Sequence, residues 1–116
     1  MSVTIYHNPR CSKSRATLAL LNEKNLDINI IEYLKSDFSI AQLTELYQQL
    51  MLSNVREMMR TGDDLYKELQ LANEALSDQE LLQAIVNHPS LLERPIVVHN
   101  KQARLGRPPE KVLEIL

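Results

Sequence analysis

The hydrophobic positions of the chain change their spacing twice, from strands to helices and back to strands. Apolar runs at residues 3–6 and 27–33 predict two short strands, and residues 12 to about 22 have the spacing of a helix. The residues expected on the buried face of this helix are Ala16, Leu18, Leu20 and Leu21. A strand, a helix and a strand in this order form a βαβ unit, so the two strands should be parallel.

The middle of the chain, residues 36–89, is predicted to be a helical insert. Ser39-Ile-Ala-Gln42 and Ser77-Asp-Gln-Glu80 match the capping box that begins many helices, and apolar residues follow each at helical spacing. Shorter helical pieces are expected around Val55, Met58 and Met59 and at residues 65–69. Pro89 should end the last helix of the insert.

The end of the chain returns to strand patterns. Residues 95–99 carry a β-branched run, Asn100-Lys101 predicts a tight turn, and residues 102–105 form the returning strand of a hairpin. Pro108 and Pro109 suit the first turn of a final helix. The residues expected on its inner face are Val112, Leu113 and Leu116.

The predicted order is therefore β-α-β, a helical insert, then β-β-α. This order favours an α/β fold with one mixed sheet of about four strands. We expect a single domain, residues 1–116, with a core formed by residues 1–35 and 90–116 and an insert at 36–89. A length of 116 residues and a hydrophobic content of 44% suit one domain with a packed core.

Composition restricts the possible partners and compartment. The net charge of −2 gives no general attraction for nucleic acid or for an anionic membrane, and we expect neither as a partner. No apolar run has the length of a membrane span or of a signal peptide. One cysteine cannot form an internal disulfide, which favours a reducing compartment and a cytoplasmic protein.

That cysteine, Cys11, lies between the first predicted strand and the first predicted helix. The first N–H groups of a helix have no internal partners and carry partial positive charge, so a thiolate there is stabilised. Lowering a thiol pKa from about 8.5 to about 6.5 requires roughly 2.7 kcal/mol. A helix end supplies about 2 kcal/mol at best. Further help is needed, and the nearby candidates are Arg10, Lys13, Arg15 and the hydroxyl of Ser14.

Two blander interpretations of the same segment stay open. A lone cysteine is often only a small buried hydrophobic residue, although its polar and basic neighbours weaken that interpretation. The segment could also bind a phosphate with the cysteine incidental, although it lacks the glycines of a phosphate-binding loop. If Cys11 is reactive, no second cysteine can resolve its adduct. A thiol from another molecule must do so, and the Cys-x-x-Ser pattern of residues 11–14 agrees with this.

These residues resemble the active-site segment of a known family. Residues 6–18, Tyr-His-Asn-Pro-Arg-Cys-Ser-Lys-Ser-Arg-Ala-Thr-Leu, strongly resemble that segment in the glutaredoxin-dependent arsenate reductases, which belong to the thioredoxin superfamily. Residues 55–60, 93–98 and 104–110 resemble three further motifs of the family. The resemblance is to a short form without a C-terminal extension, and it implies a thioredoxin-like fold.

The resemblance also implies a role for each matching residue. Cys11 would attack the arsenic of arsenate, and His7 and Ser14 would support its thiolate. The residues that would bind the oxyanion are Arg60, Arg94 and Arg107. Pro95 would be cis. Glutathione would be the co-substrate and glutaredoxin the protein partner, with no bound cofactor.

The other charged and histidine residues have simpler interpretations. Arg104 is expected to be a surface charge. Gly106, two residues after Arg104, could mark a close approach of the backbone or a positive φ. The histidines His7, His88 and His99 are scattered without the spacing of a metal site, and no metal is expected.

Two other functions remain as alternatives to arsenate reduction. The first is a glutathione-linked thiol oxidoreductase on the same scaffold with another oxyanion or disulfide substrate. The second is a regulator that binds RNA polymerase, as some relatives of these reductases do. Those regulators usually carry a Cys-x-x-Cys pair, and here Ser14 occupies the second position.

Overall fold

The structure, a computed structural model, describes residues 2–35 and 37–116 and divides into two compact units. The first unit comprises Met1–Ser36 and Arg94–Leu116, and the second comprises Asp37–Glu93. Met1 and Ser36, at which the predicted domain and its insert begin, lie outside the described residues.

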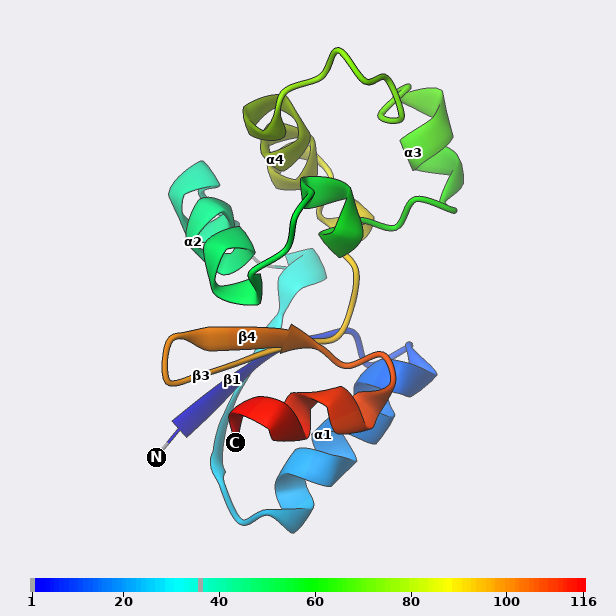
Figure 1. Ribbon diagram of the computed structural model, residues 1–116. Helices are drawn as coiled ribbons and strands as arrows, with labels where there is room; N and C mark the ends of the chain where they lie inside the picture. Colours follow the sequence, from blue (N-terminus) through cyan, green and yellow to red (C-terminus); the bar gives the residue numbers. More distant parts are fainter. Residues whose placement is uncertain (1, 36) are drawn as a thin grey trace. The chain divides into compact units, whose positions relative to one another are not determined.

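The first unit contains a four-stranded sheet with the order β2-β1-β3-β4 (Figure 1). β1 and β2 are parallel, whereas β1 pairs with β3, and β3 with β4, in antiparallel fashion. The elements of this unit are β1 (Ser2–His7), α1 (Ser12–Glu23), β2 (Asp27–Glu32), η1 (Tyr33–Lys35), β3 (Ile96–His99), β4 (Gln102–Leu105) and η4 (Pro109–Ile115). The mixed four-stranded sheet, the β-α-β segment and the C-terminal hairpin are confirmed, and the helix that follows the hairpin is a 3-10 helix. β2 ends one residue earlier than predicted because Tyr33 begins a 3-10 turn.

Two features of the sheet follow directly from local sequence. The hairpin turn at Asn100 and Lys101 has φ angles of 52° and 63°, the positive values that a two-residue turn between antiparallel strands requires. In the parallel pair, His7 lies opposite Glu32, so β1 and β2 end at the same edge of the sheet. The loop that carries Cys11 leaves the sheet at this edge.

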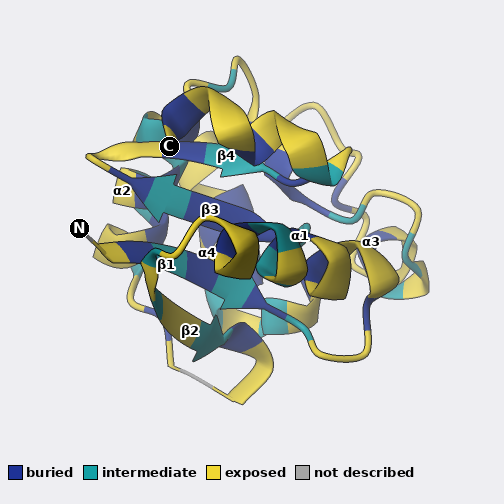
Figure 2. Ribbon diagram, turned by 90° about the horizontal axis from the view of Figure 1, so that it is seen from below, coloured by how far each residue is buried: buried dark blue, intermediate teal, exposed yellow. Residues whose placement is uncertain are grey.

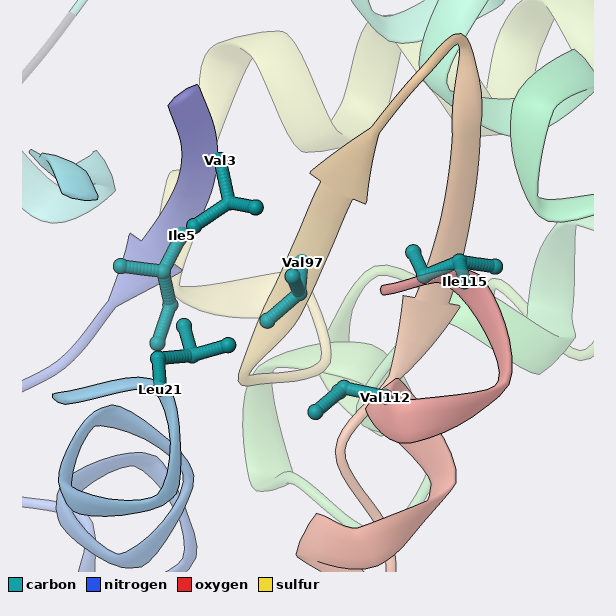
Figure 3. Packing of buried hydrophobic residues seen from close by; sticks show 6 residues of the cluster. All are labelled: Val3, Ile5, Leu21, Val97, Val112 and Ile115. Atoms are coloured by element: carbon teal, nitrogen blue, oxygen red, sulfur yellow. The ribbon is translucent and has the colours of Figure 1, made fainter. Parts of the chain in front are cut away.

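The core of the first unit lies between the sheet and two helices. α1 and η4 lie side by side on one face of the sheet (Figure 1). Six buried side chains from strands and helices point toward one another there (Figure 3): Val3, Ile5, Leu21, Val97, Val112 and Ile115. Figure 2 shows β3, one of the two central strands, mostly buried, whereas the residues of the edge strand β2 are exposed or partly buried. The sheet is therefore anchored at its centre.

The prediction of which residues of the last helix are buried was partly wrong. Val112 is buried, but Leu113 and Leu116 are each 39% exposed and Ile115 is buried in their place. The reason is that η4 is a 3-10 helix, whose three-residue turn puts positions three apart on the same side.

The buried face of α1 also differs from the prediction. Ser14, Thr17 and Leu21 are buried at spacings of three and four, whereas Ala16 is exposed. Leu18 and Leu20 are only partly buried. Polar side chains thus occupy the inward positions of the first turns of this helix.

The second unit is helical. Its elements are α2 (Ile40–Leu50), η2 (Val55–Met58), α3 (Asp64–Glu68), α4 (Asp78–Asn87) and η3 (Pro89–Leu91). Both predicted capping boxes form: the Ser39 hydroxyl accepts from the Gln42 N–H, the Gln42 side chain accepts from the Ser39 N–H, and the box at Ser77 is closed likewise.

The segment around Met59 departs from its predicted helical form. η2 ends at Met58, and Met59 is extended and forms a β-bridge with Leu92. Pairing with this distant segment overrides the local helical pattern. None of the helices in the part of the chain that the structure describes is both long and apolar enough to cross a membrane.

Candidate active site

Cys11 lies at the N-cap of α1, directly after the loop that follows β1. Its backbone is extended, with φ −94° and ψ 123°, and its carbonyl accepts the first helical bond, from the Arg15 N–H at 3.0 Å. The Cys11 N–H donates to the Asn8 carbonyl at 3.0 Å, which closes a turn. The side chain is 8% exposed, so the sulfur lies just below the surface at the positive end of the helix.

Ser14 fastens this loop to the end of β1. Its hydroxyl oxygen, fully buried, accepts from the Asn8 N–H at 3.0 Å and lies 2.6 Å from Nδ1 of His7. His7 is itself 6% exposed. Each of these buried polar groups therefore has a partner, and together they fix the backbone on both sides of Cys11.

Two arginines from the other end of the sequence lie at the sulfur. Nη2 of Arg107 is 3.9 Å from Sγ of Cys11, and Nε of Arg107 donates to the Arg94 carbonyl at 2.8 Å. Nε and Nη1 of Arg94 are buried. The bond between the two residues couples the loops that follow η3 and β4, and it orients one guanidinium toward the thiol.

The backbone around these arginines is closely packed. The Arg94–Pro95 bond is cis, the form that the family resemblance implies, and the Gly106 N–H donates to the Pro95 carbonyl at 2.9 Å. A Cβ on Gly106 would lie 2.6 Å from Oγ1 of Thr17 and 2.7 Å from Cγ of Pro95. Gly106 therefore marks a close approach of the backbone, with no positive φ.

Thr17 is a site-supporting residue that the sequence analysis missed. It is fully buried, and its hydroxyl donates to the Lys13 carbonyl at 2.8 Å. Its spacing of three from Ser14 and four from Leu21 is the one signal that could have placed it on the inner face of α1.

The surroundings of Cys11 favour its thiolate. Burial of the sulfur is the largest single effect and raises the pKa of Cys11, whereas the Ser14 N–H and the positive charge of Arg94 lower it. The N–H of Lys13 and a hydrogen bond from Arg94 add to this, so the pKa lies below its ordinary value. The helix end and an arginine distant in the sequence together stabilise the thiolate, which agrees with the expectation that a helix end alone is not enough.

The neighbouring cations do not stabilise the Cys11 thiolate through their side-chain charges, as the sequence had suggested. Arg10, Lys13 and Arg15 are exposed, and Lys13 acts on the thiol through its backbone N–H instead of its ammonium group. Nη1 of Arg15 donates to the Pro9 carbonyl at 3.3 Å, which supports the loop. The reason is geometric, since these three side chains lie on the solvent side of the loop and helix, whereas the first N–H groups of the helix point at the N-cap.

The surroundings of His7 favour its neutral form. Burial lowers the pKa of His7, and the nearby carboxylate of Glu32 offsets only part of this effect. A neutral imidazole can form a hydrogen bond with the Ser14 hydroxyl without a positive charge being buried. No group of three or more His, Cys, Asp and Glu side chains suited to a metal ion occurs within residues 2–35 and 37–116.

The remaining predicted residues lie elsewhere. Arg60 belongs to the second unit, where Nη1 is 3.3 Å from Oδ2 of Asp63, and its part in oxyanion binding stays a prediction. Arg104 forms an ion pair with Glu114, its Nε 2.9 Å from Oε1, and is partly exposed. The structure thus brings together Cys11, Ser14, His7, Arg94 and Arg107 within the first unit.

The lowered pKa of Cys11 predicts the pH dependence of its alkylation. Only the thiolate reacts, so a lower pKa moves the rise in rate with iodoacetamide to lower pH. We expect the midpoint for native protein to lie below that of the same thiol in urea-unfolded protein. The chain has one cysteine, so the signal is unambiguous. Coincident midpoints, or a higher native midpoint, would contradict the assigned environment.

Comparisons with known proteins agree with this geometry. The model of the ArsC family matches residues 6–115. An arsenate reductase of Haemophilus influenzae is 53% identical over 116 residues, covering all of both chains. The Escherichia coli protein YfgD is 54% identical over 114 residues, covering 98% of this chain and 96% of YfgD. A solved structure, the arsenate reductase from Vibrio cholerae, superposes with a TM-score of 0.98 at 59% identity, covering 100% of this chain and 98% of the other.

Proposed function

Because the chain belongs to the ArsC family and has its thioredoxin-like fold, we propose that it reduces arsenate to arsenite with electrons from glutathione. The observation that carries this proposal is the position of Cys11. Its thiol lies at the start of α1, with Nη2 of Arg107 at 3.9 Å and its pKa lowered in part by Arg94. A stabilised thiolate beside two guanidinium groups suits attack on a small oxyanion.

The arginines solve an electrostatic problem in this reaction. The nucleophile and arsenate are both anions, and they repel one another on approach. Arg94 and Arg107 supply positive charge and planar sets of N–H donors, which match the oxygens of a tetrahedral oxyanion. The N–H groups at the start of α1 can bind a further oxygen. Arg60 is proposed as a third oxyanion ligand on the family resemblance alone.

The electrons in the proposed reaction come from thiols. The Cys11 thiolate bonds to arsenic and displaces one arsenate oxygen, which takes up protons from the solvent and leaves as water. The thiolate of glutathione attacks the sulfur of Cys11 in this adduct. The bond between that sulfur and arsenic breaks with its electron pair going to arsenic, and the two sulfurs end as a mixed disulfide. Arsenic thus gains two electrons and leaves as arsenite. Glutaredoxin then reduces the disulfide and restores the Cys11 thiolate.

The single cysteine explains the need for outside thiols. A chain with one cysteine has no resolving thiol of its own, so glutathione acts as co-substrate and glutaredoxin as partner. No resident cofactor takes part in this scheme. A cytoplasmic location follows from the same requirement, because that compartment holds the reduced thiols the reaction consumes. His7, Ser14 and Pro95 support the thiolate and the arginine loop without contacting arsenic.

A coupled assay tests the proposal. Purified protein with glutathione, glutaredoxin and glutathione reductase should oxidise NADPH only when arsenate is present. Cys11→Ser should abolish this activity, since an alcohol is not ionised at neutral pH and is a poor nucleophile for arsenic. Ser12→Ala, which alters an exposed neighbour in the same turn, is the matched control and should retain activity. Folded wild-type protein without arsenate-dependent turnover would overturn the proposal.

A further inference from the structure

A cavity of about 380 Å³ lies beside the cysteine loop, and none of Cys11, Arg94 and Arg107 lines it. Residues 7–10, which follow β1, form one wall, and Glu32, Leu34 and Lys35, at the end of β2, form the other. This volume lies at the lower end of the range of small-molecule sites, about 300–1,000 Å³. It suits a ligand of the size of a short peptide and is too small for a longer protein segment.

The position of the cavity follows from the parallel pairing of β1 and β2. His7 lies opposite Glu32 at the ends of the two strands, so the loops that leave them diverge from the same edge. Ligands of α/β proteins commonly bind in the crevice outside the carboxyl ends of parallel strands. Here the wall after β1 is the turn closed by the bond from the Cys11 N–H to the Asn8 carbonyl. The wall therefore ends one residue before the nucleophile.

The chemistry of the walls is mixed in sign. Arg10 and Lys35 carry positive charge, Glu32 carries negative charge, and Pro9 and the 48% exposed Leu34 add apolar surface. Nζ of Lys35 lies 3.6 Å from Oε1 of Glu32, and their side chains are 79% and 44% exposed. An exposed ion pair of this kind contributes little to stability, so Lys35 can turn to a ligand at small cost. Such walls fit a small zwitterion better than a simple anion.

We propose that this cavity is the binding site for glutathione, with Arg10 and Lys35 receiving its carboxylates and Glu32 its ammonium group. This inference rests on the proposed function, which makes glutathione the thiol that attacks the Cys11 adduct. The apolar surface of Pro9 and Leu34 contacts the carbon chain of the peptide. Placed in this way, the resolving thiol approaches Cys11 from a cavity that neither Arg94 nor Arg107 lines.

The length of glutathione agrees with this placement. An extended tripeptide spans roughly 10 Å, and its thiol lies near the middle. Consecutive Cα atoms are about 3.8 Å apart, so a peptide whose carboxylate binds Arg10 has its thiol within reach of residue 11. The cavity thus places the second nucleophile beside the loop that carries Cys11.

Binding is measured first with S-methylglutathione, which has the same charges but no thiol to react. Titrated into 15N-labelled wild-type protein, it should shift the backbone amide resonances of Arg10, Leu34 and Lys35. It should compete with glutathione, and not with arsenate, in the coupled assay. Shifts confined to other residues, or no shifts at millimolar ligand, would overturn the proposal. This measurement needs no turnover, so it stays decisive even if arsenate is not the substrate.

Lys35→Glu is the variant that tests the cavity by charge. It should raise KM for glutathione about tenfold, the effect of one charge-assisted hydrogen bond, with kcat at saturating glutathione and KM for arsenate unchanged. Lys24→Ala, an exposed lysine of the same unit that does not line the cavity, is the matched control. An unchanged KM in Lys35→Glu, or an equal rise in Lys24→Ala, would refute the site. Lys35 is preferred to Glu32, because Glu32 also affects the pKa of His7.

Discussion

Arg94→Ala is expected to lower kcat/KM for arsenate by about 10²–10³-fold and to raise the pKa of the Cys11 thiol. The charge of Arg94 and a hydrogen bond from its side chain stabilise the thiolate. The Arg94 carbonyl that accepts from Nε of Arg107 at 2.8 Å is backbone and is retained in the alanine variant. Loss of one preorganised donor at a site of developing charge costs this much in other enzymes. Here the same change also removes part of the activation of the nucleophile.

Arg94→Lys separates the two effects. A lysine keeps the positive charge but lacks the planar set of N–H donors, so the pKa of Cys11 should partly recover while arsenate turnover stays low. Arg104→Ala is the matched control, because Arg104 lies in the same unit and pairs with Glu114. It should change turnover less than twofold, since exposed ion pairs contribute about 0–1 kcal/mol. Equal losses in Arg94→Ala and Arg104→Ala would show that general stability, and not the site, is affected.

The cysteine half of this site could be predicted from local sequence. A polar, basic segment between a strand and a helix places Cys11 at a helix start, and Cys11 is the N-cap of α1. The arginine half could not, because Cys11 and Arg107 are separated by 96 positions and no local rule brings them together. Only the family resemblance indicated Arg94 and Arg107, and only the antiparallel pairing of β1 with β3 shows how Arg94 comes near.

The sheet was more predictable than the faces of the helices. The strand directions within the βαβ unit and the hairpin follow from element order, because a helix between consecutive strands favours parallel pairing and a two-residue turn enforces antiparallel pairing. The pairing of β1 with β3, which joins these two parts, does not follow from either rule. Which face of a helix is buried depends also on tertiary packing and hydrogen bonds, and the spacing of apolar residues does not show these. Ser14 and Thr17 are buried because they hydrogen-bond around the cysteine loop, and hydrophobicity alone would place them at the surface. For η4, a small change of helix period moved the core position from Leu116 to Ile115.

Gly106→Ala is expected to destabilise the protein by about 1–3 kcal/mol, the usual cost of overpacking a well-packed region. The new Cβ would lie 2.6 Å from Oγ1 of Thr17 and 2.7 Å from Cγ of Pro95, and neither group yields easily. Thr17 is fully buried and bonded to the Lys13 carbonyl, and the proline ring is rigid. The backbone must therefore shift, and it carries Arg94 and Arg107 on either side. A displacement of about 1 Å at a reacting site can cost about 10²-fold in rate.

Gly62→Ala supplies the control for this effect, because nothing lies within 4 Å of a Cβ there and φ is not positive. It should leave turnover unchanged and stability unchanged or slightly higher, since alanine restricts the unfolded chain. Thermal unfolding and the coupled assay measure both quantities. Adding Thr17→Ala to Gly106→Ala removes the 2.6 Å contact but keeps the one with Pro95, so partial recovery is expected. If Gly106→Ala behaves like Gly62→Ala, the close approach does not position the arginines. If stability falls while turnover per folded molecule holds, the glycine serves packing alone.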